Sequence, residues 1–526
     1  MKKYFIALII LAFGCSKTCD SKKNNTNNTI TVAVGSAIEN IDPRYASSVT
    51  AIRTSQLVFA TLLVMGQDGV PKPFLAKNIE KIDDLNYKVE LRDNLYFHDH
   101  TPLTSSDVAY SFLDLSSNDV NSPHQSKFYY LKNIQIIDEK NMIFELSVPY
   151  AVFMTDLCGN GIVSKKSCLN RSKKCQHEYN GSGPFMLDKW DNAKEIIHLK
   201  PFDKWFEGAA KTKIDIRIVR EENTRVLELI AKKTDLIEGD IPASRLEELK
   251  KNDFLDIKII PSFSFTYLAF NLRGPHGKDL QSKENITRSA LANKKVRQAI
   301  AHAIDIEQII NKIFLNTAQR VTGLIPNSHW AKDHSLKLIN FDPQKAESLL
   351  DEAGFYRKKD NNRFDITIMT SQDRMRQNIA LSYKNFLAKV GINVSIKVKD
   401  FSAIFQDMRQ GNFEMFSALW VPITDPDLYY WVHHSSNIPS EKKEGGNRHA
   451  YNNPEVDKLI EQGRYTSDQE QRKAIYKNIE NILIDELPYI PLWSENRIIV
   501  MNKRIMGYDP LSTGSLINLR KAYISE

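Results

Sequence analysis

The sequence has no apolar stretch long enough to cross a membrane, no internal repeat and no block of charge of one sign. Its longest apolar run covers residues 5–14, short of the roughly 20 residues that a transmembrane helix needs, so we do not expect an integral membrane protein. Its 71 basic and 64 acidic residues are interspersed, which argues against nucleic-acid binding. Without a fixed repeat period, a solenoid is not expected either.

Signatures of enzyme chemistry are also missing. The sequence contains no phosphate-binding loop and no dinucleotide-binding glycine pattern. The Gly-Ser-Gly-Pro segment at 181–184 differs in spacing from the nucleophile elbow of hydrolases, and a turn explains it better. No known metal-ligand spacing is matched by His98, His100, His433 and His434. We therefore expect a protein that is not an enzyme and uses no metal and no cofactor.

The composition is that of a large folded protein with helices and strands mixed along the chain. Hydrophobic residues fill 42% of the 526 positions, and this length fits two large lobes or about three to four domains. Apolar and polar residues alternate at 214–218 and 392–398, as in half-buried strands. Helical spacing places Val296, Ile300 and Ala303 on one stripe. The sequence therefore predicts an α/β protein.

The amino terminus has the features of an export signal. Two lysines precede the apolar residues 5–13, and a glycine and Cys15 follow. This pattern is typical of a signal peptide, here residues 1–14, that is removed at export. The glycine before Cys15 resembles the lipobox of bacterial lipoproteins, although Ala12 and Phe13 depart from its usual pattern. We expect lipid attachment at Cys15 and a periplasmic or cell-surface location at a bacterial membrane, with plain secretion as the alternative.

The residues behind Cys15 and the remaining cysteines fit an exported protein. Residues 15–29 are rich in Ser, Lys, Asn and Thr and predict a flexible tether. Cys158, Cys168 and Cys175 lie close together, and disulfides persist outside the cytosol. We expect a disulfide between two of these three cysteines, with the pairing open, and no metal site, since no CxxC or HxxxH pattern accompanies them.

A series of short motifs then follows along the chain. They lie at 41–43, 68–69, 73–76, 91–99, 102–108, 181–185, 270–271, 296–300, 304–305, 349–354, 425–427 and 487–492. In this order and at these distances the series resembles the oligopeptide- and dipeptide-type solute-binding proteins of bacterial ABC importers, family 5, over essentially the whole chain from residue 30. The sequence departs from the family at His100, where glycine is usual, and at Ser105, where alanine is usual.

The resemblance implies a two-lobed periplasmic-binding-protein-like fold of type II, the large three-domain class, with the ligand cleft between the lobes. Segments 30–73, 183–267 and 498–526 are expected to form the core domain of the first lobe. Segment 74–182 is expected to be a domain inserted into that lobe, and segment 268–497 to be the second lobe. Closure of the lobes around the ligand agrees with the general behaviour of hinged binding proteins.

Three strand edges are candidates for the ligand-binding surface. A protein that binds many peptides needs strand edges for the peptide backbone and roomy pockets for side chains. The family resemblance places three such edges in the cleft: Gly35, Ser36 and Ala37; Phe265, Thr266 and Tyr267; and Ser417, Ala418, Leu419 and Trp420. For Tyr267 and Trp420, ordinary core packing is the alternative.

The usual partner of a peptide's ammonium group is missing from this sequence. The best-known oligopeptide binders place an aspartate shortly after the tryptophan of the third edge. Here the first acidic residue after Trp420 is Asp425. Either Asp425 or Asp427 takes this role, or the ligand lacks a free amino terminus. For both residues, a turn-forming Asp-Pro-Asp segment is the alternative.

The sequence thus predicts a monomeric lipoprotein that binds peptides and delivers them to a membrane permease driven by a separate ATPase. A non-peptide solute, such as an oligosaccharide, a metal chelate or a blocked peptide, is the alternative within the same fold. Two further alternatives are a surface adhesin or receptor and a secreted hydrolase.

Overall fold

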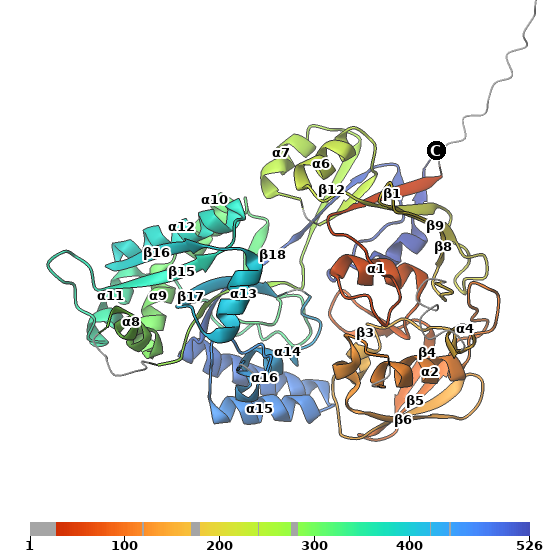
Figure 1. Ribbon diagram of the computed structural model, residues 1–526, viewed down its shortest axis with the longest axis horizontal. Helices are drawn as coiled ribbons and strands as arrows, with labels where there is room; N and C mark the ends of the chain where they lie inside the picture. Colours follow the sequence, from red (N-terminus) through yellow and green to blue (C-terminus); the bar gives the residue numbers. More distant parts are fainter. Residues whose placement is uncertain are drawn as a thin grey trace, which may run out of the picture.

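The computed structural model describes residues 28–117, 120–169, 179–239, 241–274, 282–420, 422–440 and 443–525. The signal peptide, Cys15, nearly all of the tether and Cys175 lie outside the described residues. The rest forms two lobes (Figure 1). The first lobe holds a seven-stranded and a four-stranded sheet, and the second holds a six-stranded sheet. No helix in the described ranges is both long and apolar enough to cross a membrane.

The seven-stranded sheet is assembled from distant parts of the chain. In spatial order its strands are β12 (Leu255–Ile260), β19 (Arg497–Asn502), β11 (Leu236–Glu238), β1 (Thr29–Val34), β10 (Lys213–Ile218), β9 (Ile196–Pro201) and β8 (Phe185–Asp191). β1 runs parallel to β10 and pairs Ile30 with Ile214 and Val32 with Ile216. All four side chains are fully buried, so the alternation at 214–218 is confirmed as a strand. Helices α1 (Val49–Val58) and α6 (Glu222–Ile230) pack against this sheet, and α7 (Leu246–Leu249) shares the core cluster of α6.

The four-stranded antiparallel sheet lies below it in the first lobe (Figure 1). Its strands are β4 (Ala76–Lys81), β5 (Asn86–Leu91), β7 (Asn141–Leu146) and β6 (Leu131–Ile136), and the helices of this part are α2 (Ser105–Ser116), α3 (Phe153–Asp156) and α4 (Lys165–Leu169). α2 begins with a capping box, in which Asp107 accepts the backbone N–H of Thr104 at 3.0 Å. Phe112 of α2 meets Phe128 and Phe144 edge to face, which anchors the helix on the sheet.

The six-stranded sheet forms the centre of the second lobe. Its strands are β14 (Ala318–Arg320), β18 (Tyr489–Glu495), β13 (Phe265–Phe270), β17 (Met415–Trp420), β15 (Phe364–Thr370) and β16 (Ile392–Val398). Nine helices accompany it within the described ranges: α8 (Lys283–Ala292), α9 (Lys294–Ala303), α10 (Ile306–Ile313), α11 (Pro343–Glu352), α12 (Arg374–Lys389), α13 (Phe401–Gln410), α14 (Leu428–His433), α15 (Pro454–Tyr465) and α16 (Gln469–Glu486).

Two patterns expected from the sequence appear in this lobe. The stripe of α9 is confirmed, because Val296, Ile300 and Ala303 are buried. The alternation in β16 is confirmed at Ile392 and Val394, but Val398 at the end of the strand is 48% exposed. β16 is the last strand of the sheet, so its far end has less of the lobe to pack against.

The chain crosses between the lobes twice, once between β12 and β13 and once between β18 and β19. β13 belongs wholly to the six-stranded sheet, so the first crossing lies before Phe265 and not after residue 267. The crossing segments hydrogen-bond to each other: the backbone N–H of Glu495 donates to Ser264 Oγ at 3.0 Å, and Ser264 Oγ lies 3.1 Å from Ser494 Oγ. Paired crossings of this kind are suited to act as a hinge.

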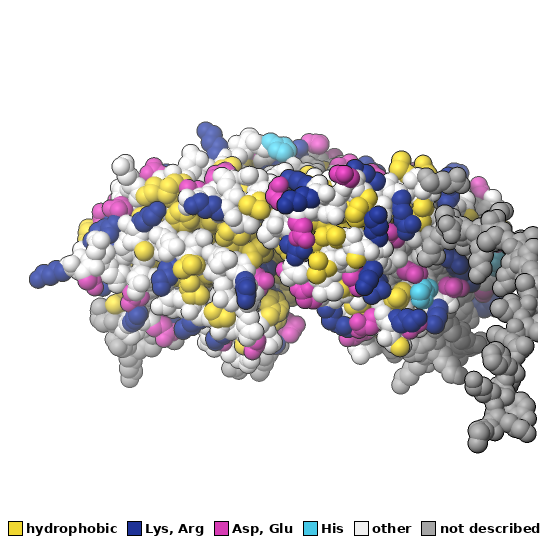
Figure 2. Space-filling view, turned by 90° about the horizontal axis from the view of Figure 1, so that it is seen from above, with side chains coloured by type: hydrophobic (Ala, Val, Ile, Leu, Met, Phe, Trp, Pro, Cys, Tyr) yellow, Lys and Arg dark blue, Asp and Glu magenta, His cyan; other side chains and the backbone are white. Residues whose placement is uncertain are grey.

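Charged side chains of both signs are mixed over the molecular surface. Figure 2 shows lysines and arginines interspersed with aspartates and glutamates on the face it views, and an indentation between the two lobes. The mixing agrees with the interspersed charges of the sequence.

Candidate functional site

A cavity of about 310 Å³ has walls from both lobes. This volume is at the lower end of the range of ~300–1,000 Å³ that is usual for small-ligand pockets. The first lobe contributes α1, residues 124 and 127, and parts of segments 155–161 and 511–517, while the second lobe contributes Pro422 and Thr424. Because the two lobes share the lining, a solute in this cavity touches both of them.

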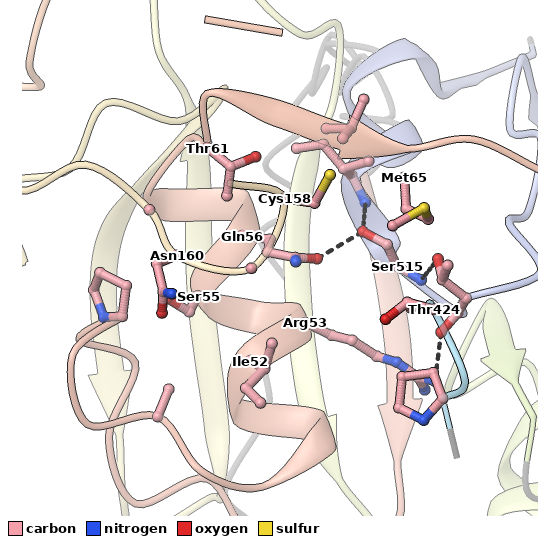
Figure 3. A pocket seen from close by; sticks show the side chains of 18 of the residues that line it. Ile52, Arg53, Ser55, Gln56, Thr61, Met65, Cys158, Asn160, Thr424 and Ser515 are labelled. Carbon is pink, nitrogen blue, oxygen red and sulfur yellow. Dashed lines mark hydrogen bonds between the residues drawn. The ribbon is translucent and has the colours of Figure 1, made fainter. Parts of the chain in front are cut away.

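Helix α1 presents one of its faces to the cavity (Figure 3). Ser48 caps its amino end by accepting the N–H of Ala51 at 3.1 Å. Leu57 and Val58 are fully buried on the side of the core. The i, i+3, i+4, i+7 spacing of an α-helix brings four other side chains onto the cavity face: Val49, Ile52, Arg53 and Gln56.

The carboxyl-terminal segment lines the cavity next to α1. Ser515 Oγ donates a hydrogen bond to Gln56 Oε1 at 2.7 Å, and Arg53 Nη2 donates to the carbonyl oxygen of Thr513 at 3.2 Å (Figure 3). These bonds fix the direction of two polar side chains of α1. They also tie the last part of the chain to the site.

Segment 155–161 forms another wall and carries a buried free thiol. Burial raises the pKa of Cys158 well above the ordinary value for cysteine, so its thiol stays protonated and is a poor nucleophile. A side chain at Gly161 would meet the carbonyl oxygen of Phe59 at 2.7 Å, so the close approach of these two segments requires glycine. Cys168 forms a disulfide bond, and Cys158 does not.

Asp425 lies next to the cavity but is already engaged. Arg472 Nη2 donates to Asp425 Oδ1 at 2.6 Å, and Arg472 Nη1 donates to Oδ2 at 2.9 Å. Thr155, a first-lobe residue of the cavity wall, donates to the same Oδ2 at 3.3 Å. The carboxylate of Asp425 is thus paired with an arginine and reached from across the cleft.

Asp427 also lies beside an arginine, through a single ion contact and not a bidentate pair. Arg464 Nε lies 2.8 Å from Asp427 Oδ1, and its guanidinium stacks over the ring of Tyr430 at 3.7 Å. Burial raises the pKa of Asp427 to about 6, against the opposing effect of Arg464. The carbonyl oxygen of Arg464 accepts the N–H of Ala151 at 2.9 Å, a second contact between the lobes. The proposed role of Asp425 or Asp427 as an ammonium partner stays a prediction, and both carboxylates are occupied here.

The first predicted strand edge lies outside the 310 Å³ cavity. Ser36 and Ala37 are exposed just after β1. Gly35 approaches the guanidinium of Arg225 and lines a small separate pocket, which shares only Arg53 with the larger cavity.

The other two edges lie side by side in the second lobe. β13 and β17 pair antiparallel and bring Phe265 opposite Trp420. Phe265, Thr266 and Tyr267 are buried in the core, which agrees with the core-packing alternative for Tyr267. The four residues from Ser417 to Trp420 are half-buried, and the guanidinium of Arg448 lies 5.6 Å from the centre of the Trp420 ring. Neither edge lines the cavity.

Several lining residues escaped the sequence analysis. Arg53 and Gln56 share a helix face with Val49 and Ile52, and this amphipathic spacing was the available signal. Lys127, Thr155, Asn160 and Ser515 come from short helical turns and loops that meet only in the folded chain, and no local pattern marks them.

The histidines weighed as metal ligands do not meet. His98 Nε2 lies 3.0 Å from the carbonyl oxygen of Gly183, whereas His433 is buried in the second lobe with its Nδ1 3.1 Å from His449 Nε2. Burial lowers the pKa of His98 to about 4. Within the described ranges no group of three or more metal-ligating side chains is found.

The chain belongs to a known family of binding proteins. The family of bacterial extracellular solute-binding proteins, family 5 Middle, matches residues 70–440, which is well over half of the chain. Its members are extracellular proteins that bind solutes. The resemblance inferred from the motif series is thereby confirmed.

Individual relatives support the same fold. The oligopeptide-binding protein AppA of Bacillus subtilis (strain 168) is 27% identical over 477 residues, covering 86% of this chain and 83% of AppA. The structure of NikZ from Campylobacter jejuni in complex with Ni(L-His) matches with a TM-score of 0.77 and 26% identity, covering 94% and 99% of the two chains. The structure of the ABC transporter substrate binding protein CtaP from Listeria monocytogenes has a TM-score of 0.83 at 23% identity and covers 95% and 100%. The expected two-lobed periplasmic-binding-protein fold is confirmed.

Proposed function

We propose that this protein is the solute-binding subunit of an ABC importer, which holds a peptide between its lobes and hands it to a membrane permease. The observation that carries the proposal is the cavity lined by both lobes. Thr155 of the first lobe and Thr424 of the second lobe both belong to its lining. A solute bound there stabilises the closed arrangement, because it gains contacts with both walls only when the lobes approach.

Relatives of this chain suggest two classes of solute. AppA is named as an oligopeptide-binding protein, and NikZ was solved with a nickel–histidine complex. Peptide is our first choice, and a non-peptide solute such as a metal chelate or a blocked peptide is the second. The mostly apolar lining favours both of these over an oligosaccharide, which needs many polar partners.

A non-enzymatic role agrees with the chemistry of the cavity walls. The Cys158 thiol in the lining is held protonated by burial, and His124 bonds to the carbonyl oxygen of Ala46 at 2.8 Å through Nε2. Neither group is set up as an activated nucleophile or base. We propose that the protein binds its solute without changing it.

The proposal also includes the setting of the protein. We propose that it is a monomer, anchored by lipid at Cys15 on a tether, with no cofactor. We also propose the three-part division of the chain, in which the four-stranded sheet belongs to a domain inserted between 74 and 182. The strand order supports this division, because β4 to β7 pair only with one another.

Small-angle X-ray scattering tests the proposal with the solute that copurifies with the protein from its own host. The solute is first removed from the protein and then added back. Its addition is expected to lower the radius of gyration of the protein and raise its melting temperature. A solute that binds tightly but leaves both values unchanged would contradict binding between the lobes.

A further inference from the structure

The part of the first lobe that contains the four-stranded sheet touches the second lobe away from the hinge. Figure 1 shows α15 at the lower edge of the molecule, beside this sheet, whereas β12 and β18, which lead into the two crossings, lie higher. A rotation about the crossings moves the two lower surfaces apart. A contact that joins them therefore favours the arrangement in which the lobes are together.

The end of α15 supplies a backbone contact between the lobes. Arg464 lies in the last turn of this helix, where carbonyl oxygens have no N–H partner within the helix. The carbonyl oxygen of Arg464 instead accepts the backbone N–H of Ala151, from the first lobe, at 2.9 Å. Thr155, four residues further along, donates to Asp425 across the same boundary at 3.3 Å. Separation of the lobes breaks both hydrogen bonds.

The side chain of Arg464 lies between tyrosines of both lobes. Its guanidinium lies 3.7 Å from the ring centre of Tyr430 in the second lobe, and 5.8 Å from those of Tyr129 and Tyr150 in the first. Distances within about 6 Å give a cation–π attraction, which is stronger where water is excluded. The Arg464 side chain is only 11% exposed, so water is largely excluded here.

Each half of this contact is held in place by its own lobe. In the second lobe, Asp427 Oδ1 lies 2.8 Å from Arg464 Nε and fixes the direction of the guanidinium. In the first lobe, the ring of Tyr150 stacks on Tyr130 with the ring centres 4.2 Å apart, and Tyr129 meets Tyr150 edge to face. Because both halves are ordered by local packing, little side-chain freedom is lost when they meet.

We propose that Arg464 is a latch between the lobes, which binds Ala151 and the two first-lobe tyrosines and raises the fraction of solute-free protein whose lobes are closed. The rest of the solute-free protein is open and closes when solute binds. A solute that stabilises the closed arrangement has less of the population left to shift, so it binds more tightly. The latch goes beyond the proposed function, because it acts whatever the solute is.

Two variants test the latch in protein from which the solute has been removed. Arg464→Lys keeps a positive charge beside Asp427 but loses the flat group that covers the rings. Tyr129→Ala removes a first-lobe ring that is 52% exposed. Each variant is expected to have a larger radius of gyration in small-angle X-ray scattering than the wild type. In Arg464→Lys, hydrogen–deuterium exchange of the peptide that contains Ala151 is expected to be faster on the order of 10-fold. The effect of Tyr129→Ala is expected to be smaller and in the same direction.

The double variant distinguishes a contact across the lobes from two separate local effects. If Arg464 and Tyr129 act on each other, the exchange rate of the double variant is lower than the product of the two single effects gives. Arg92→Lys is the matched control, because the Arg92 guanidinium lies 5.4 Å from the ring centre of Phe206 within the first lobe. It is expected to match the wild type in both measurements.

A wild-type radius of gyration and a wild-type exchange rate in Arg464→Lys overturn the latch, and so does a double variant whose effect equals the product of the single effects. If Arg464→Lys does not fold, Tyr129→Ala decides alone, because it leaves the pair of Arg464 and Asp427 in place. No solute takes part in these measurements. Failure to find a solute would therefore contradict the proposed function and leave the latch intact.

Discussion

Arg472 and Asp425 form a bidentate ion pair that is buried in the second lobe beside the cleft. Both side chains are more than nine-tenths buried, and the two nitrogen–oxygen distances are 2.6 and 2.9 Å. The same carboxylate accepts a hydrogen bond from Thr155 of the first lobe at 3.3 Å. The pair therefore holds the segment after β17 in place at the point where that segment meets the other lobe.

Replacement of Asp425 by asparagine is expected to destabilise the protein. The variant leaves Arg472 buried without a carboxylate, a situation that costs about 3–5 kcal/mol in comparable cases. Urea unfolding measures this loss in the free energy of unfolding. Asp93→Asn is the matched control, because Asp93 and its partner Lys140 are both exposed, and the loss expected there is much smaller. Equal stability of the two variants would show that the buried pair is not structural.

The acid Asp156 is expected to give stability a dependence on pH. Its pKa is raised to about 7 by burial, with Tyr130 and Lys127 acting against the shift and Asp425 and Asp427 adding to it. An unfolded aspartate loses its proton near pH 4, so between about pH 4 and 7 the folded protein holds more protons than the unfolded chain. Stability from this group is therefore present at low pH and is lost as pH rises toward 7.

Asp156→Asn removes this dependence, since asparagine resembles the protonated acid and keeps an oxygen for the Tyr130 hydroxyl. From pH 4.5 to 7.5 the variant is expected to gain stability relative to the wild type, by about 1.4 kcal/mol for each unit of pKa shift. Urea unfolding at several pH values gives both curves. Parallel curves over this range would mean that the pKa of Asp156 is not raised.

Much of the fold was predictable because it rests on local patterns and on the order of motifs. Burial of one face gives a strand or helix a regular spacing of apolar residues, and this spacing can be seen in the sequence. It predicted the strands at 214–218 and 392–398 and the buried stripe of the helix that contains Val296. The family resemblance supplied the two lobes. The exact crossing before Phe265 was missed, because a strand that continues across a hinge has no local marker of which sheet it joins.

The site was less predictable, because its walls come from segments far apart in sequence. Gln56 and Ser515 bond to each other across most of the chain length, and only the fold brings them together. Asp425 was considered as a partner for a ligand's ammonium group, and sequence alone does not show that Arg472 faces it. For Tyr267 both the cleft and core packing were open; β13 is central in its sheet and its side chains are buried on both faces, which agrees with core packing.

Replacement of Cys15 by serine is expected to move the protein from the membrane fraction to the soluble exported fraction. The lipid attached at this residue is the proposed anchor, and two acyl chains hold a protein firmly where one does not. Fractionation and immunoblotting of cells that express each form give the result. Cys19→Ser, a change in the same tether, serves as the control and is expected to stay at the membrane. Membrane retention of the Cys15→Ser form would exclude lipid at Cys15 as the anchor.

The most direct test of the cavity as the solute site is native mass spectrometry of protein purified from its own host. The wild type is expected to carry a bound solute, and Ile52→Trp, which fills the cavity from α1, is expected to lose it. Leu227→Trp, an equally large change at an exposed position of α6 outside the cavity, is expected to retain it. If a folded Ile52→Trp variant carries the same solute at the same occupancy as the wild type, the solute does not bind in this cavity.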